Sequence, residues 1–139
     1  MLLDTNVLSE MMRHSPDIGV LAWFEKQLGT VFYVSAVTQS EILLGIALLP
    51  AGKRRDGLAS AAEQMFKEDF ASRCLPFDAA AAIEYSLLVA TRTAAGRPIS
   101  TEDGQIAAIA ICHQLPLATR NTKDFLLIKK LELRNPWDQ

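Results

Sequence analysis

Three acidic residues lie where their carboxylates could do chemistry together. Asp4 directly follows a short apolar run, Glu41 is the one charged residue between positions 35 and 49, and Asp103 falls in the first turn of a predicted helix. Carboxylates that meet at one place repel one another, and a divalent cation relieves that repulsion. Oxygen ligands suit Mg²⁺ or Mn²⁺, ions that can activate water and hold a phosphodiester for in-line displacement. The three acids therefore predict a metal site for this class of hydrolysis.

A further polar segment, residues 119–124, directly follows another predicted strand. It carries the carboxamide of Asn121 and the carboxylate of Asp124, three residues apart. In open α/β sheets, ligands bind at the carboxyl ends of the strands, which is where Asp4 and this segment both lie. We therefore expect the segment to supply further oxygens to the same site.

Each of the three acids also has a purely structural explanation. Asp is a favoured helix N-cap, so Asp4 taken alone is more simply explained as a cap. Ser100 and Asp103 resemble a capping box with Asp in place of Glu or Gln, and the cap again explains Asp103 taken alone. Glu41 could pair with an arginine instead of a metal ion, and for this residue the two explanations remain equally open.

The elements that position these residues follow from the apolar pattern. Short apolar runs alternate with longer helical patterns, which predicts an α/β fold with a mainly parallel sheet. Strands are expected at 1–3, 31–34, 117–119 and 131–134, the last as an edge strand. Helices are expected at 5–12, 17–27, 35–49, 53–72, 78–95 and 100–114. Ser35, Asp78 and either Ser100 or Thr101 are expected to cap three of these helices.

The helix that carries Glu41 is mostly apolar and is expected to be buried nearly all round. Val37, Leu44, Gly45 and Leu48 share the stripe of Glu41. The carboxylate is therefore expected to point toward the interior or a cleft, where a charge needs a cation.

The composition limits the class of protein. A chain of 139 residues is expected to form one domain spanning 1–139. Its 14 Lys and Arg against 16 Asp and Glu exclude a polycation that binds nucleic acid through bulk charge. Any such contact needs a local patch or metal ions. Hydrophobic residues make up 50% of the chain, which excludes a disordered protein and predicts apolar surface that meets a partner.

The two cysteines, Cys74 and Cys112, form no C-x-x-C pair. This pattern excludes a disulfide framework and a zinc ribbon, and it favours a cytoplasmic protein. The amino terminus has no basic region before an apolar stretch, so no secretory signal is expected. No run is apolar enough to span a membrane.

Other hydrolytic chemistries lack their motifs. No G-x-S-x-G is present, and His14 and His113 have no Ser or Cys nucleophile context. A phosphatase of the haloacid dehalogenase type would need a second Asp at Asn6, so the chain resembles that family poorly. Four basic residues adjoin the predicted site and are placed to contact phosphates: Arg13, Arg97, Arg120 and Lys123.

Five sequence strings resemble the PIN-domain ribonucleases, specifically the VapC and FitB-type toxins of bacterial toxin–antitoxin modules. In chain order they are LLDTNVLSE, VSAVTQSEILLGIALL, STEDGQIAAIA, LATRNTKDF and the terminal LRNPW. The resemblance covers essentially the whole chain. It implies a three-layer α/β/α sandwich with a mainly parallel central sheet and an Mg²⁺- or Mn²⁺-dependent endoribonuclease that cleaves RNA. It also implies a homodimer and inhibition by a small DNA-binding antitoxin.

The resemblance assigns roles residue by residue. It gives metal-binding carboxylates to Asp4, Glu41 and Asp103. Asn6 would orient Asp4, and the hydroxyl groups of Thr5 and Thr119 would order the site through hydrogen bonds.

The fourth motif departs from the family pattern. Many relatives carry an acid directly after T-R, where this chain has Asn121. The fourth acidic role is therefore weakened or taken by Asp124, and a second metal site stays open. The position of Asn121 directly after the strand end favours Asn121 as the residue that lines the site.

A second class of function is a non-catalytic PIN-like subunit that acts in an antitoxin–DNA complex. The presence of three carboxylates at the motif positions favours the enzyme.

Overall fold

Parallel pairing of very short strands builds the centre of the molecule. The computed structural model describes residues 1–138. Its strands are β1 (Leu2–Leu3), β2 (Val34–Ser35), β3 (Cys74–Leu75), β4 (Leu117–Ala118) and β5 (Leu133–Arg134). One parallel sheet has the order β1-β4-β5, a second pairs β2 with β3, and a parallel bridge between Leu2 and Tyr33 joins the two. The strands thus run in one direction in the order β5, β4, β1, β2, β3, with β5 at the edge as predicted.

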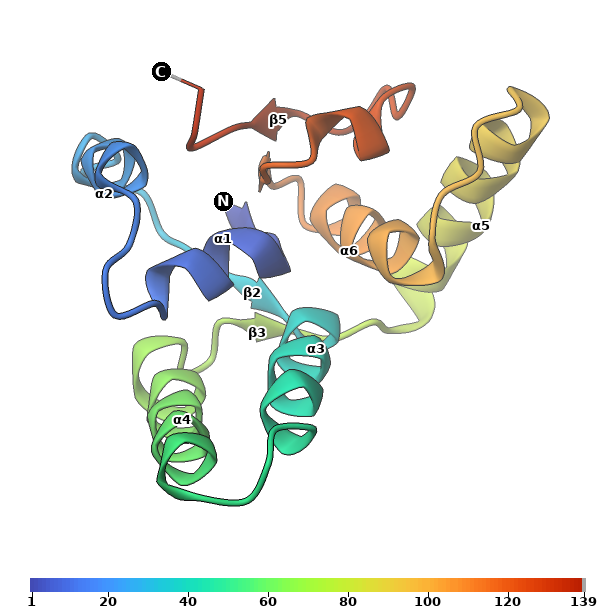
Figure 1. Cartoon of the computed structure of the whole chain (residues 1–139). Helices are drawn as coiled ribbons and strands as arrows, with labels where there is room; N and C mark the ends of the chain where they lie inside the picture. Colours follow the sequence, from blue (N-terminus) through green and yellow to red (C-terminus); the bar gives the residue numbers. More distant parts are fainter. Residues whose placement is uncertain (139) are drawn as a thin grey trace.

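Helices connect the strands (Figure 1). They are α1 (Thr5–Met11), α2 (Ile18–Glu25), α3 (Ala36–Ala47), α4 (Lys53–Gln64), α5 (Ala79–Ala94) and α6 (Thr101–Cys112), with a π-helical segment η1 (Met65–Asp69) and a 3₁₀ segment η2 (Thr122–Phe125). The side chains of Ser35, Asp78 and Ser100 accept backbone hydrogen bonds at the starts of α3, α5 and α6. The three predicted caps are therefore confirmed, with Ser100 rather than Thr101 capping α6.

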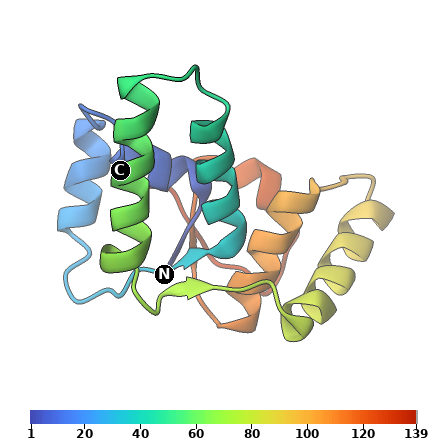
Figure 2. The same cartoon turned by 90° about the horizontal axis from the view of Figure 1, so that it is seen from below.

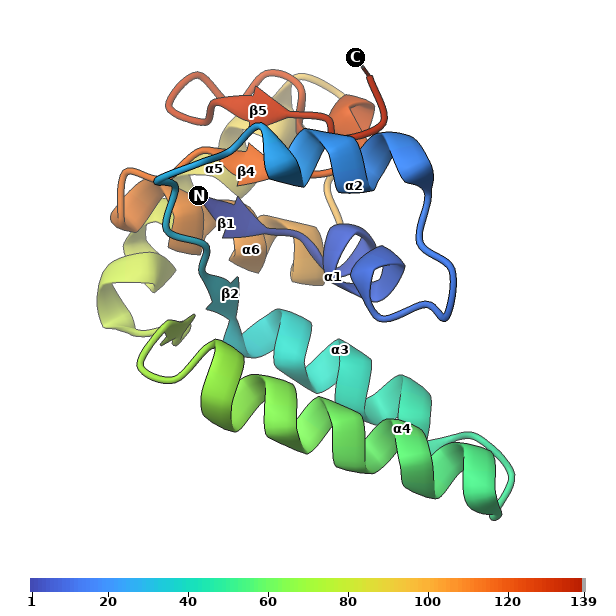
Figure 3. The ribbon, with the colours of Figure 1, turned by 90° about the vertical axis from the view of Figure 1, so that its left-hand side faces the viewer.

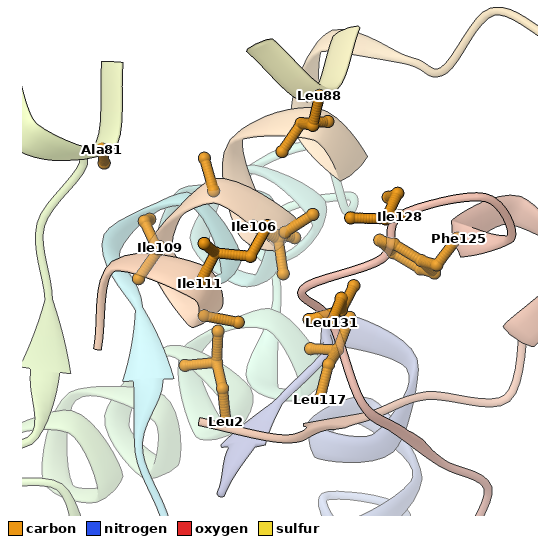
Figure 4. Close-up of a cluster of buried hydrophobic side chains, with 13 residues drawn as sticks. Leu2, Ala81, Leu88, Ile106, Ile109, Ile111, Leu117, Phe125, Ile128 and Leu131 are labelled. Atoms are coloured by element: carbon orange, nitrogen blue, oxygen red, sulfur yellow. The ribbon is translucent and has the colours of Figure 1, made fainter. Parts of the chain in front are cut away.

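Helices cover both faces of the sheet. Leu2 and Leu3 point to opposite faces, as successive strand residues do. Leu2 packs in one buried cluster with residues of α5 and α6, and Leu3 packs in another with residues of α1, α2, α3 and α4 (Figure 4 shows the first). Figure 3 shows α1 and α2 in front of the strands and α5 and α6 behind them. The fold is the predicted α/β/α arrangement.

One face of α3 is exposed, which corrects the expectation that this helix is buried nearly all round. Its buried residues are Thr38, Ile42 and Ile46, whereas Leu44 and Leu48 are 59% and 76% exposed. The helix packs against α1, α4 and α6, and Figure 2 shows it between α4 and α6. Leu44 and Leu48 lie on the side that these contacts leave uncovered. An apolar pattern does not distinguish a stripe that faces the core from one that faces solvent or a partner.

The expected helix over 53–72 is helical as far as Asp69, but its second half changes from α- to π-helical geometry. The α-helix ends at Gln64, η1 follows, and Ser72 has a positive φ of 63° that ends the helical path. The chain then enters β3, a strand of two residues that is too short to show an alternating pattern. Within residues 1–138, no helix has the length and apolar character needed to cross a bilayer.

Candidate metal centre

Asp4 lies at the carboxyl end of β1 and is held by three donors. Its Oδ1 accepts the backbone N–H of Thr5 at 2.8 Å. Its Oδ2 accepts the hydroxyl of Thr119 at 2.7 Å and the amide Nδ2 of Asn6 at 3.2 Å. Asp4 is only 4% exposed. The carboxylate caps α1 and also stands at the sheet edge where ligands bind, so both explanations of this residue hold together.

Glu41 is reached by a chain of hydroxyl groups. Thr5 Oγ1 lies 2.7 Å from Glu41 Oε1 and 2.9 Å from Thr38 Oγ1. Because an ionised carboxylate only accepts, Thr5 donates its one proton to Glu41 and Thr38 must donate to Thr5. None of the ion pairs found among residues 1–138 includes Glu41, so the alternative arginine pair is not formed.

Asp103 is placed by the start of α6. Its backbone N–H donates to Ser100 Oγ at 3.2 Å, which is one half of the predicted capping box. The next residue, Gly104, lets α6 approach α5 closely, because a Cβ there would lie 2.9 Å from Tyr85 Cε2 and 3.2 Å from Val89 Cγ2. The close approach therefore places the first turn of α6, which carries Asp103, against α5.

The carboxylates share one electrostatic field. The pKa of Asp103 is raised to about 6, first by burial and then by the charges of Asp4, Asp124 and Glu41, while a hydrogen bond from Ser100 opposes the rise. Burial also raises the pKa of Asp4, against the lowering effect of its hydrogen bonds, and the charge of Asp124 adds to the rise. Asp103 is therefore repelled by carboxylates from three other segments, and no cation is among the causes of either shift.

The fourth segment contributes Thr119 as a central hydroxyl. Besides donating to Asp4, Thr119 Oγ1 accepts Asn6 Nδ2 at 3.3 Å and the backbone N–H of Asn121 at 3.1 Å. The Asn121 side chain is exposed, whereas Asp124 is half-buried in η2. The effect of Asp124 on the pKa values of Asp4 and Asp103 favours Asp124 as the fourth group of the site. The position of Asn121 directly after the strand favours Asn121 instead.

These oxygens suit a hydrated divalent ion. Within residues 1–138, no three His, Cys, Asp or Glu side chains already stand as a complete set of metal ligands. Mg²⁺ commonly keeps several of its waters and binds through one or two carboxylates, so a preassembled cage is not required. The mutual repulsion of the acids is the feature of the chain that such an ion would relieve.

The sequence patterns do not identify Thr38 and Gly104 as residues that order the site, and they predict Arg120 only as a contact for phosphates. Thr38 is fully buried and lies one helical turn before Glu41, a spacing that could have marked it. Gly104 follows Asp103 directly. Arg120 donates its backbone N–H to Asn6 Oδ1 at 3.1 Å, and its guanidinium lies 4.9 Å from the ring centroid of Trp137.

A cleft of about 710 Å³ extends from the centre between α1, α3 and α4. Thr5 and Glu41 stand on its wall, so the cleft reaches the Glu41 side of the candidate centre. Arg13, His14 and Arg54 also line it. Of these, Arg13 is bound to Glu10 at 3.0 Å.

Comparisons with known proteins identify the family of the chain. A family model for the PIN domain matches residues 1–131. The chain is 41% identical over 137 residues to VapC ribonuclease Y4jK of Sinorhizobium fredii, which covers 99% of this chain and 97% of that relative. It is 40% identical over 136 residues to Toxin FitB of Neisseria gonorrhoeae, with 98% and 97% covered.

A solved structure of FitAB bound to an IR36 DNA fragment has a TM-score of 0.91 and 39% identity, and the match covers 99% of this chain and 96% of that one. The resemblance to proteins of the VapC and FitB type is therefore confirmed over nearly the whole length. On its fold and these matches, the chain belongs to the PIN-domain family.

Proposed function

We propose that this protein is a metal-dependent endoribonuclease toxin that hydrolyses RNA phosphodiester bonds and is neutralised by a cognate antitoxin. The observation that carries the proposal is that acids from separate segments act on one another: Asp124 raises the pKa of Asp4, and Asp4, Asp124 and Glu41 raise that of Asp103, in addition to burial, the largest cause of both shifts. The relatives named as a VapC ribonuclease and a FitB toxin support the same activity.

Asp4, Glu41 and Asp103 would hold Mg²⁺ or Mn²⁺. The bound ion supplies an activated water and stabilises the leaving oxygen of the phosphodiester. The hydroxyl of Thr119 and the amide of Asn6 keep one Asp4 oxygen oriented, and Thr5 does the same for Glu41. Such supporting hydrogen bonds fix the direction of a ligand and raise its affinity for metal.

Arg120 is the cation best placed to meet an RNA phosphate. Its backbone is fixed to Asn6, and its guanidinium lies over Trp137, an arrangement that limits its rotamers. None of the ion pairs found among residues 1–138 includes Arg120, so its charge is free for a phosphate. A local cation and a metal ion together would let a chain of net charge −2 bind RNA. The cysteine pattern favours the cytoplasm, and we place the proposed activity on RNA there.

Protein partners complete the proposal. Exposed leucines on α3 and the exposed Ile83 and Leu87 on α5 leave apolar surface for a homodimer and for a small DNA-binding antitoxin. The FitAB structure bound to DNA supports the antitoxin. An antitoxin arginine would be attracted to the acid cluster. Light scattering at micromolar concentration should show a dimer, and a monomer would contradict that part of the proposal.

The activity itself is tested by incubating the purified protein with structured and unstructured RNAs in Mg²⁺, in Mn²⁺ and in EDTA. Cleavage that requires a divalent ion and is absent from a mock preparation is the expected result. The alternative, a non-catalytic PIN-like subunit in an antitoxin–DNA complex, predicts no metal-dependent cleavage of any RNA.

A further inference from the structure

A buried arginine, Arg92, ties together two loops of the chain. It lies in the last turn of α5 and is only 5% exposed. Its Nε donates to the backbone carbonyl of Arg97 at 2.8 Å, and its Nη1 donates to the backbone carbonyl of Leu126. The two acceptors are 29 positions apart in the sequence, so the guanidinium joins segments that the chain itself does not connect closely.

Each of these loops leads directly into the candidate metal centre. Arg97 lies three residues before Ser100, the N-cap of the helix that carries Asp103. Leu126 is the C-cap of η2, the segment that carries Asp124. The distance between the two carbonyls that Arg92 holds therefore influences the distance between the two carboxylates.

Among residues 1–138, the charge of Arg92 has no acidic partner. None of the ion pairs found in the described part of the chain includes it. Burying a cation away from water is unfavourable unless hydrogen bonds replace its hydration. The planar fork of a guanidinium can fix two acceptors at once, which a lysine ammonium on a flexible stem does less well. Arg92 makes two such hydrogen bonds, one to the carbonyl of Arg97 and one to that of Leu126.

The backbone beside Leu126 is strained. Leu127 has a φ of +68°, a conformation that side chains other than glycine rarely adopt. Its side chain is 52% exposed, so packing of Leu127 itself does little to impose that conformation. Strained residues persist where surrounding contacts determine them, and the bond from Arg92 to the preceding carbonyl is such a contact.

Apolar side chains on both sides of Leu126 and Leu127 pack in the core. Leu88, one turn before Arg92 on α5, joins Phe125 and Ile128 in the buried cluster drawn in Figure 4. This packing attaches η2 to the core. The hydrogen bond from Arg92 to the carbonyl of Leu126 then fixes the backbone between Phe125 and Ile128, where the exposed side chains of Leu126 and Leu127 do not pack in the core.

We propose that Arg92 is a positioning residue that sets the separation of Asp103 and Asp124 by tying residue 97 to residue 126. The inference rests on the proposed function, since it assigns those carboxylates to one metal centre. Arg92 touches neither the ion nor RNA, and it acts through the two loops.

The test compares Arg92→Met and Arg92→Lys with a matched control, Arg73→Met. Arg73 also donates to two backbone carbonyls, those of Phe32 and Asp69, but these lie toward the amino ends of β2 and β3, at the opposite edge of the sheet. Two readouts are taken: hydrogen–deuterium exchange of the metal-free protein, and Mn²⁺ affinity from the electron paramagnetic resonance of free Mn²⁺.

Arg92→Met should speed exchange in residues 97–104 and 121–128 but not in 2–11, and should weaken Mn²⁺ binding by about 10-fold. Arg92→Lys should fall between it and the unchanged protein, and Arg73→Met should alter neither readout selectively. Uniformly faster exchange, or Mn²⁺ affinity within about twofold of the unchanged protein, would overturn the inference. If Arg92→Met does not fold, the same two readouts on Arg92→Lys decide. If the unchanged protein binds no Mn²⁺, the proposed function fails, while exchange still decides whether Arg92 holds the two loops.

Discussion

The hydroxyl of Thr119 lies 2.7 Å from Oδ2 of Asp4, although the two residues are 115 positions apart. The parallel pairing of β1 with β4 brings them together, because each residue directly follows its strand. The same hydroxyl accepts two further N–H groups, so its one proton and both lone pairs are in use. Asp4 therefore depends on a residue from the far end of the chain for its orientation.

Thr119→Val tests this dependence. The substitution keeps the branched shape of a fully buried side chain but removes the donor to Asp4 and the acceptor for two N–H groups. We expect RNase activity and Mn²⁺ affinity to fall by about 10- to 100-fold, since supporting hydrogen bonds to metal ligands have effects of that size. Thr119→Ser keeps the hydroxyl and should retain most of the activity. Equal activity in the Val and Ser variants would show that the hydroxyl does not matter.

Asp103 should make the stability of the metal-free protein fall as the pH rises. Its folded-state pKa is raised from 3.8 to about 6, so between these values the folded protein holds a proton that the unfolded chain has released. The unfolded state binds fewer protons in this window, and the free energy of unfolding therefore decreases with pH until the pH passes about 6. Above that pH the destabilisation is fully present.

The measurement is urea unfolding in EDTA at several pH values, for the unchanged protein and for Asp103→Asn. The variant should lose this part of the pH dependence and be more stable at neutral pH. Mn²⁺ affinity of the unchanged protein should rise with pH through the same window, since the ligand must be ionised. An identical pH dependence in Asp103→Asn would refute the assignment.

Much of this site could be predicted from the sequence because its parts are local. An acid directly after a short apolar strand, and Ser100 three residues before Asp103, are patterns that need no knowledge of the fold. The hydroxyl chain from Thr38 through Thr5 to Glu41 could not be found this way, since it depends on how α1 packs against α3. The exposed stripe of α3 was missed because periodicity reports an apolar face but not what covers it.

Gly104 should not tolerate a larger side chain. Gly104→Ala places a methyl group 2.9 Å from Tyr85 Cε2, and overpacking of this kind costs about 1–3 kcal/mol of unfolding free energy. Gly57 in α4 is the matched control, because a Cβ there meets nothing within 4 Å. Gly57→Ala should stabilise the protein by roughly 0.5–1 kcal/mol through helix propensity. Denaturant unfolding measures both, and a neutral Gly104→Ala would mean that α5 and α6 are not packed this closely.

The fourth position is resolved by a pair of reciprocal variants. If Asp124 completes the centre, Asp124→Asn should lower activity and metal affinity as strongly as Asp103→Asn, and Asn121→Asp should change little. If Asn121 lines the site, Asn121→Asp should tighten metal binding by adding charge, and Asp124→Asn should be mild. The influence of Asp124 on the pKa values of Asp4 and Asp103 favours the first outcome. A Mn²⁺ titration of both variants distinguishes the two.

The central claim is that Asp4, Glu41 and Asp103 together hold the ion that makes this protein a ribonuclease. The most direct test is RNA cleavage in Mg²⁺ and in Mn²⁺ by Asp4→Asn, Glu41→Gln and Asp103→Asn, with Glu102→Gln as the control because Glu102 is exposed beside Asp103. Each exchange keeps the volume of the side chain and removes the charge that the metal requires. We expect all three variants to fold and to lose cleavage, while Glu102→Gln cleaves like the unchanged protein. Near-normal cleavage by any one of the three, in a preparation free of the mock activity, would contradict the role assigned to that residue.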